Sequence, residues 1–198
     1  MPYHEYPMEE KPYKRRSIRI QGFDYSQAGA YFVTICAWKR ACIFGEATED
    51  GIVLLKTGEI AVEEWLNTAV IRPYAALDEF TVMSNHVHGI LWLRINETGT
   101  ARRAPTREGF GKPVTGSLPT IIGAFKAAVT RRINALRSGK GEVWQRGFYE
   151  HVIRDDESLN RIREYIISNP CSWELDRENM HRKGDNEFYQ WLANVGNF

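Results

Sequence analysis

The sequence has few cysteines, no long apolar run and almost no net charge. Its three cysteines are too scattered for a disulfide framework or a CxxC metal site. No stretch approaches the roughly 18 consecutive apolar residues of a membrane span, and the N-terminus lacks the apolar core of a secretory signal. We therefore expect a cytoplasmic protein with reduced thiols and no membrane partner.

The charges are distributed unevenly along the 198 residues. Residues 101–140 carry nine basic side chains against Glu108 alone, whereas residues 41–80 carry eight acidic and two basic ones. A cationic segment on a nearly neutral protein suggests contact with a polyanion, typically nucleic acid. A solvated helix face and a basic loop explain the same charges equally well.

Hydrophobic periodicity predicts a mixture of strands and helices. β-Branched and aromatic side chains predict strands at 30–40, 51–56, 77–85 and 86–94, and an extended segment at 143–154. Helical spacing of apolar residues predicts helices at 57–72 with Thr57 as N-cap, at 118–137, and at 156–169 with Asp155 or Asp156 as cap. This order favours an α+β fold, in which helices pack on an antiparallel sheet.

We expect one domain flanked by two shorter segments. Residues 1–22 contain three prolines and a basic end, and they are expected to form an N-terminal arm. The domain itself covers residues 23–170 and includes a flexible basic loop at 95–117. Residues 171–198 carry irregularly spaced aromatics and are expected to pack back on the domain as a C-terminal extension.

Two of the five histidines, His86 and His88, lie one residue apart in a predicted strand. Side chains at i and i+2 of a strand point to the same face, so both imidazoles can reach one metal ion. A strand whose polar face happens to carry histidines is the simpler alternative. The HxH pattern also occurs in metal-dependent hydrolases, for which His151 or His181 would supply a further ligand.

Tyr165 and Asn169 are four residues apart on the last predicted helix and therefore share a face. That face borders the apolar stripe that should contact the sheet. A tyrosine at the edge of the core and an asparagine that caps the helix before Pro170 are the simpler interpretations.

Together these segments resemble a known family. The stretches MSNHVHGILWL and WQRGFYEHVIRDDESLNRIREYIISNP are similar to those of REP-associated tyrosine transposases, which belong to the HUH single-tyrosine transposases. HUH denotes two histidines around a bulky hydrophobic residue, here His86-Val87-His88. The resemblance runs through most of residues 14–170, and it implies the ferredoxin-like fold of HUH nucleases.

The resemblance also implies a chemistry. Tyr165 would be the nucleophile, with Tyr149 as the competing tyrosine, and His86, His88 and Asn169 would hold Mg²⁺ or Mn²⁺. Attack on a phosphodiester would give a 5′-phosphotyrosine intermediate and allow strand transfer without ATP or another nucleotide cofactor. The implied partner is single-stranded DNA with palindromic hairpins, bound at the nucleoid by a monomer or homodimer.

Basic residues are expected to follow the DNA phosphates and to make binding salt-dependent. They are Arg15, Arg16, Arg19, Arg102, Arg103, Lys126, Arg131 and Arg132. Two rival functions remain at this point. One is a DNA-hairpin-binding protein that no longer cleaves, and the other is the metal-dependent hydrolase mentioned above.

Overall fold

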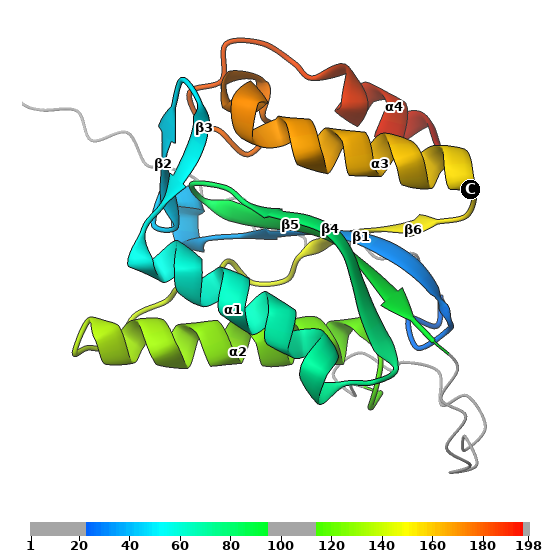
Figure 1. Cartoon of the computed structure of the whole chain (residues 1–198), viewed down its shortest axis with the longest axis horizontal. Helices are drawn as coiled ribbons and strands as arrows, with labels where there is room; N and C mark the ends of the chain where they lie inside the picture. The colour runs from blue at the N-terminus through cyan, green and yellow to red at the C-terminus, as the bar shows by residue number, and fades with distance from the viewer. Residues whose placement is uncertain (1–22, 95–113, 196–198) are drawn as a thin grey trace, which may run out of the picture.

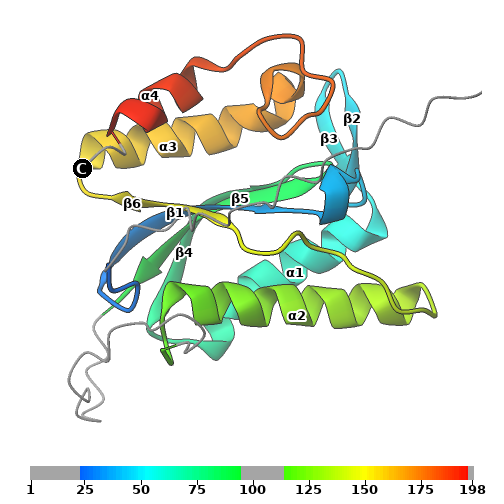
Figure 2. The ribbon, with the colours of Figure 1, turned by 180° about the vertical axis from the view of Figure 1, so that it is seen from behind.

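The computed structural model describes residues 23–94 and 114–195, which form one sheet covered by helices on both faces. Figures 1 and 2 show helices α3 and α4 on one face and helices α1 and α2 on the other. The strands are β1 (Gly29–Cys36), β2 (Gly45–Thr48), β3 (Gly51–Leu54), β4 (Ala75–Val82), β5 (His86–Leu93) and β6 (Tyr149–Ile153). The α-helices are α1 (Lys56–Ile71), α2 (Leu118–Leu136), α3 (Asp156–Ser168) and α4 (Glu187–Val195). Two 3₁₀ segments, η1 (Trp38–Arg40) and η2 (Asn169–Leu175), follow β1 and α3.

The main sheet has the strand order β4-β5-β1-β6, and all its neighbouring strands are antiparallel. In the central pair, Cys36 lies opposite His86 and Thr34 lies opposite His88. The predicted α+β class with an antiparallel sheet is therefore confirmed. Strands β2 and β3 form a separate hairpin at one end of the molecule (Figure 1).

Successive residues of β1 point to opposite faces of the sheet, so this strand contributes to two cores. Tyr31, Val33 and Ile35 pack on the side of α1 and α2, where Trp65 and Phe125 are buried. On the other side Phe32 packs with residues of α3 and α4, namely Leu159, Ile162, Tyr165, Ile166, Phe188 and Leu192. The second core fixes α3, with its tyrosine, above the histidine strand.

Several predicted elements differ in detail from the observed ones. The first strand ends at Cys36 because the chain turns into η1, where Lys39 and Arg40 both have positive φ. Thr57 is not the N-cap of α1, which begins one residue earlier after Leu55; the Thr57 hydroxyl instead donates to the carbonyl of Ile43. Helix α3 starts as expected, with the Asp155 carboxylate accepting from the Ser158 amide at 2.7 Å.

Two elements were not predicted at all. Strand β2 is only four residues long, and helix α4 lies in the stretch expected to be an irregular extension. Within the described ranges, no helix has the length and apolar character needed to cross a membrane. The predicted arm at 1–22 and most of the loop at 95–117 fall outside the described residues.

Candidate metal and tyrosine site

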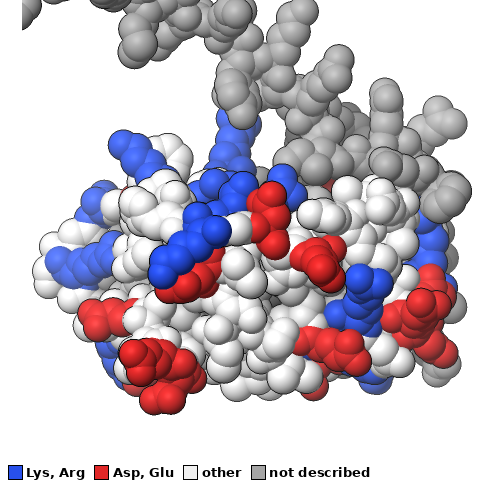
Figure 3. All heavy atoms as spheres, turned by 90° about the horizontal axis from the view of Figure 1, so that it is seen from above, with Lys and Arg blue, Asp and Glu red and all other residues white. Residues whose placement is uncertain are grey.

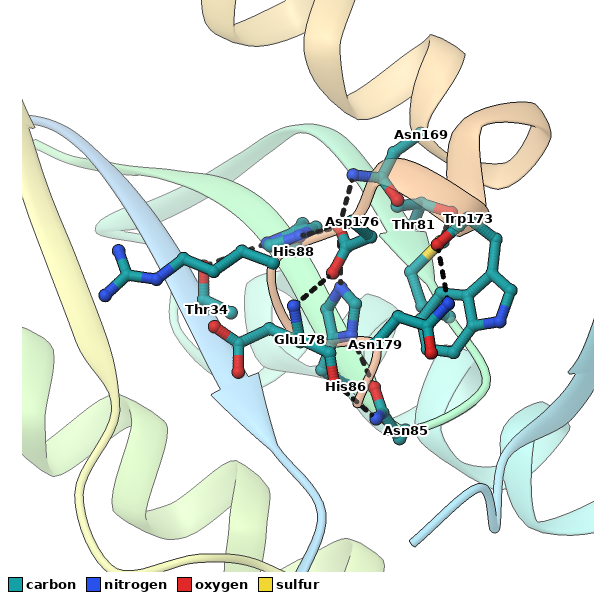
Figure 4. A network of polar contacts seen from close by, with 12 residues as sticks. Thr34, Thr81, Asn85, His86, His88, Asn169, Trp173, Asp176, Glu178 and Asn179 are labelled. Carbon is teal, nitrogen blue, oxygen red and sulfur yellow. Dashed lines mark hydrogen bonds and ion pairs between the residues drawn. The ribbon is translucent and has the colours of Figure 1, made fainter. Parts of the chain in front are cut away.

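His86 and His88 lie side by side at the start of β5, on the face that α3 and η2 cover (Figure 4). Both side chains are fully buried, and their ring centroids are 4.2 Å apart. Full burial lowers the pKa of His86 to about 3, with the neighbouring His88 as the second cause. His86 is therefore neutral at physiological pH, which leaves a nitrogen lone pair free to bind a cation.

Each histidine is held through its Nδ1 atom by an oxygen from a neighbouring side chain. Nδ1 of His86 lies 2.8 Å from Oδ1 of Asn85, and Nδ1 of His88 lies 2.9 Å from Oγ1 of Thr34 on β1. The amide oxygen of Asn85 can only accept, so His86 must carry its proton on Nδ1. Its Nε2 then faces the interior with a lone pair and has no hydrogen-bond partner among the described residues.

Tyr165 of α3 lies above the histidines, as does Asn169, the C-cap of that helix (Figure 4). The Tyr165 hydroxyl lies 3.1 Å from Nε2 of His88, 3.0 Å from Oδ2 of Asp176 and 2.7 Å from the Tyr189 hydroxyl. Asn169 is buried, and its Nδ2 donates to Oδ2 of Asp176 at 2.7 Å. The four residues named from the sequence therefore meet around one point.

Asp176 is the site residue that the sequence analysis missed. It follows η2, it is fully buried, and its Oδ2 lies 3.8 Å from Nε2 of His86 and 3.6 Å from Nε2 of His88. Burial opposes its ionisation, but His88, His86 and Asn169 outweigh that cost and hold the pKa of the carboxyl well below its usual range. The site thus combines two buried imidazoles with one carboxylate.

These donor atoms fit a divalent cation. His86, His88 and Asp176 each offer a ligand atom, and the three atoms lie within 4.8 Å of one another. Ligands about 2.1 Å from a common ion lie roughly 3.0–3.5 Å apart, so the two Nε2–Oδ2 separations need to shorten only slightly. The buried Oδ1 of Asn169 has no hydrogen-bond partner among the described residues and would supply a further neutral oxygen. Imidazole and carboxylate together suit Mn²⁺, and carboxylate and amide oxygens suit Mg²⁺.

Tyr165 is protonated and shielded in this structure. Its side chain is 5% exposed, and its ring stacks on Phe188 of α4 at a centroid distance of 3.7 Å. Burial, followed by the neighbouring Tyr189 and Asp176, raises the pKa of the Tyr165 hydroxyl far above its usual value. The hydroxyl therefore donates its hydrogen bond rather than carrying charge.

The other candidate ligands and the second candidate nucleophile do not join this cluster. His151 lies on β6 opposite Phe32, and His181 is exposed. Tyr149 lies on the face of the sheet that α3 and α4 cover, where its ring packs against Phe32 at a centroid distance of 6.5 Å. Neither histidine belongs to the group that could hold a metal ion in the described part of the chain.

The predicted DNA-binding residues have different surroundings. Arg15, Arg16, Arg19, Arg102 and Arg103 lie outside the described residues. Lys126 donates to the carbonyls of Gln145 and Gly147 at 2.6 and 2.8 Å. Arg132 pairs with Glu63 and Glu64 of α1, whereas Arg131 is exposed. Their contact with DNA stays a prediction.

Comparison with known proteins supports the fold described above. No protein-family model matches the chain. A protein of Haemophilus influenzae named "Putative REP-associated tyrosine transposase" is 26% identical over 148 residues, which cover 74% of this chain and 73% of that protein. The solved structure of a REP-associated tyrosine transposase bound to a REP hairpin superimposes with a TM-score of 0.53 at 16% identity, covering 80% of this chain and 74% of that one.

The chain therefore has the fold of a REP-associated tyrosine transposase. An uncharacterized protein of Haemophilus influenzae is also similar, at 36% identity over 166 residues that cover 82% of this chain and 92% of that protein. At 16% identity the structural likeness to the transposase establishes the shared fold and leaves the chemistry to the residues of this chain.

Proposed function

We propose that this protein is a REP-associated tyrosine transposase, that is, a metal-dependent single-stranded DNA endonuclease and strand transferase that forms a 5′-phosphotyrosine intermediate. The observation that carries the proposal is the distance of 3.1 Å between the Tyr165 hydroxyl and Nε2 of His88. It brings a hydroxyl suited to be the nucleophile and an imidazole suited to hold a metal to one buried point. A core-edge tyrosine would have no need of a histidine pair beside it.

Each residue of the site has a distinct task. His86, His88 and Asp176 would hold a divalent ion, with Asn169 as the further ligand predicted from the sequence. That ion would polarise the scissile phosphate and orient it for in-line attack. Asp176 accepts the hydrogen bond of the Tyr165 hydroxyl, which aims the oxygen at the same point. The net charge of the ligands is −1, so the loaded site stays cationic and attracts a phosphate.

Tyr165 supplies the attacking oxygen. Its bond to phosphorus forms as the bond from phosphorus to the 3′ oxygen breaks. Tyr165 loses its proton towards the Asp176 carboxylate, to which the hydroxyl donates, and the released 3′ oxygen gains one proton to become a hydroxyl. A second 3′-hydroxyl can reverse the step and join two strands without ATP. Because Phe188 stacks on Tyr165, DNA can reach the oxygen only when α4 shifts or the tyrosine turns outward.

The proposed substrate is hairpin-forming single-stranded DNA. A solved structure with the same fold is that of a REP-associated tyrosine transposase bound to a REP hairpin. Palindromes that flank the gene of this protein are therefore the first DNA to test. The protein would act on chromosomal DNA in the cytoplasm.

The deciding experiment incubates the protein with such oligonucleotides, labelled at the 3′ end, and with Mg²⁺ or Mn²⁺. The 5′-phosphotyrosine fragment carries the label, so we expect a labelled band at protein mass on a denaturing gel. Tyr165→Phe and a chelator should each remove the band, while Tyr149→Phe should retain it.

The alternatives predict different gels. A hairpin-binding protein would bind the oligonucleotides without any adduct in either metal. A metal-dependent hydrolase would cut them with Tyr165→Phe as well as with the wild-type protein and would leave no covalent product. A band that persists in Tyr165→Phe and disappears in Tyr149→Phe would identify Tyr149 as the nucleophile.

A further inference from the structure

A groove lies on the other side of the sheet from the tyrosine, between α2 and residues 141–146. It is a shallow depression, open to solvent, of about 640 Å³, and it is lined by residues of α2, by residues 141–146 and by Trp38 in η1. A hollow of this size suits one small ligand or a short unpaired strand. It is distinct from the buried site of His86, His88 and Tyr165.

The groove combines an exposed aromatic ring with positive charge. Trp38 is 38% exposed. Lys126, Arg131 and Arg146 line the same groove, and Glu142 is the single acidic residue among its lining. Both arginines are exposed. Aromatic faces that stack bases beside cations that follow phosphates are what single-stranded nucleic acid requires.

The turn that presents Trp38 is held in an uncommon conformation. Lys39 and Arg40, directly after it, have φ values of 52° and 54°, which residues other than glycine seldom adopt. The amide of Trp38 donates to the carbonyl of Val143 at 2.8 Å, which ties the turn to the groove wall. Such a backbone persists only where its surroundings enforce it.

The same turn is bonded to the buried site. Nδ2 of Asn85, whose oxygen holds His86, donates to the carbonyl of Arg40 at 3.1 Å. Strand β1 ends at Cys36, which lies opposite His86, and Trp38 comes two residues later. At about 3.3 Å per residue, Trp38 is only some 7 Å further along the chain. A DNA strand that leaves the tyrosine site past the end of β1 would therefore meet Trp38 within a few nucleotides.

The face over α3 and α4 carries charges of both signs (Figure 3), and Arg161 there lies over the Trp191 ring at 4.7 Å. On α2 itself, Arg132 is already paired with Glu63 and Glu64. In the groove at Trp38, two exposed arginines coincide with an exposed ring.

We propose that the groove formed by Trp38, Arg131 and Arg146 binds the unpaired DNA that adjoins the hairpin, with a base stacked on Trp38 and phosphates near the two arginines. This inference rests on the proposed function for the identity of the strand. It assigns a second contact to the substrate, apart from the metal and tyrosine.

The test measures binding of the full-length protein to labelled hairpins that differ only in their unpaired flank. The hairpins carry no flank, a flank on the 5′ side or a flank on the 3′ side, and affinity is read by fluorescence anisotropy. For the wild-type protein we expect one of the two flanks to raise affinity. Trp38→Ala should remove roughly 5- to 100-fold of that gain while leaving the flankless hairpin unaffected.

Three further variants separate stacking, charge and overall structure. Trp38→Phe should keep most of the gain, because a smaller ring still stacks. Arg131→Ala should reduce both the gain and its salt dependence, whereas Arg137→Ala, on the same helix outside the groove, should change neither. Circular dichroism checks that each variant is folded.

The proposal is overturned if neither flank raises the affinity of the wild-type protein, or if Trp38→Ala and Arg131→Ala retain the full gain. The covalent adduct on the hairpin is a separate readout. A flank-dependent gain in affinity without any covalent adduct would support DNA binding in the groove and contradict the proposed chemistry. An adduct without a gain in affinity would support the chemistry and contradict DNA binding in the groove.

Discussion

Asn85 determines which nitrogen of His86 can bind a metal. Its Oδ1 accepts the Nδ1 proton of His86, and its Nδ2 donates to the carbonyls of Glu178 and Arg40, which prevents the amide from turning round. Second-sphere groups of this kind typically change metal affinity 10- to 100-fold. Asn85 is thus a positioning residue of the proposed site.

Replacing Asn85 with alanine should allow His86 to carry its proton on either ring nitrogen. We expect Asn85→Ala to weaken Mn²⁺ binding by about 10- to 100-fold, measured by the electron paramagnetic resonance signal of free Mn²⁺. Nitrogen NMR should show the His86 ring as a mixture of tautomers, which simple loss of packing would not produce. Unchanged affinity together with an unchanged tautomer would contradict the assignment.

Asp176 and Asn169 compete for the part of third metal ligand, and their substitutions separate them. Asp176→Asn keeps the size of the side chain and removes its charge, so we expect Mn²⁺ affinity to fall by at least about 10-fold. Asn169→Ala should have a smaller effect, because the Nδ2 of Asn169 contacts Asp176 and only its Oδ1 is left for an ion. Asp185→Asn, an exposed carboxylate paired with Arg182, is the matched control. A larger loss in Asn169→Ala would restore the ligand set predicted from the sequence.

At the scale of elements, α3 is fastened to the sheet by an ion pair as well as by its apolar face. Arg163 donates from Nε and from an Nη atom to the Asp78 carboxylate of β4 at 2.8 and 2.6 Å. The Trp92 indole also donates to Asp78, at 2.9 Å. The hydrogen bonds from Arg163 hold the pKa of Asp78 at about 2, although partial burial works in the opposite direction.

This pair gives the stability a defined dependence on pH. Because the folded protein lowers the pKa of Asp78 from 3.8 to about 2, its contribution is fully present above about pH 4 and is lost as pH falls towards 2. We expect Asp78→Asn to cost about 1–2 kcal/mol at pH 6, since Arg163 is partly exposed, and almost nothing at pH 2. Urea unfolding at both pH values measures the difference. An equal cost at both would assign the effect to packing.

Gly89 marks the closest approach between β5 and α1. A Cβ atom at this position would overlap the Trp65 ring, which is itself fully buried. We expect Gly89→Ala to lower the free energy of unfolding by about 1–3 kcal/mol, measured by chemical denaturation. Gly123→Ala on α2 is the control, because nothing lies within 4 Å of its added Cβ. Equal stability of both variants would mean that Trp65 moves away without cost.

Local patterns predicted most of these elements, and the reasons for the exceptions are physical. The spacing of His86 and His88, and of Tyr165 and Asn169, is set by the repeat of a strand and of a helix, so the sequence alone indicates that each pair shares a face. Asp176 follows Pro170 and an irregular 3₁₀ segment, and no repeat relates it to the histidines. Its place depends on tertiary contacts, which one sequence does not display.

At the scale of the whole molecule, the proposed ion would connect the sheet to the C-terminal segment. His86 and His88 come from β5, whereas Asp176 comes after η2. An ion bound by both stabilises the folded chain, because the unfolded chain does not hold these ligands together. The core of Phe32, Phe188 and Leu192 makes the same connection through apolar contacts.

Mn²⁺ should therefore raise the melting temperature. At about 100 times its dissociation constant we expect roughly 2.7 kcal/mol of added stability, which for a chain of this length is about 5–10 °C. Thermal melts followed by circular dichroism, with and without Mn²⁺, measure the shift, and Asp176→Asn should reduce it sharply. A melting temperature that Mn²⁺ leaves unchanged would argue against an ion in this position.

The order of these residues along the chain has a consequence during protein synthesis. Ribosomes add about 5–20 residues per second, so Asp176 follows His88 by roughly 4–18 s. In that interval a nascent chain carries the histidine pair and then the tyrosine, without the carboxylate that joins them. If Asp176 is needed for the metal, an unfinished polypeptide would lack the proposed activity until translation has passed this last ligand.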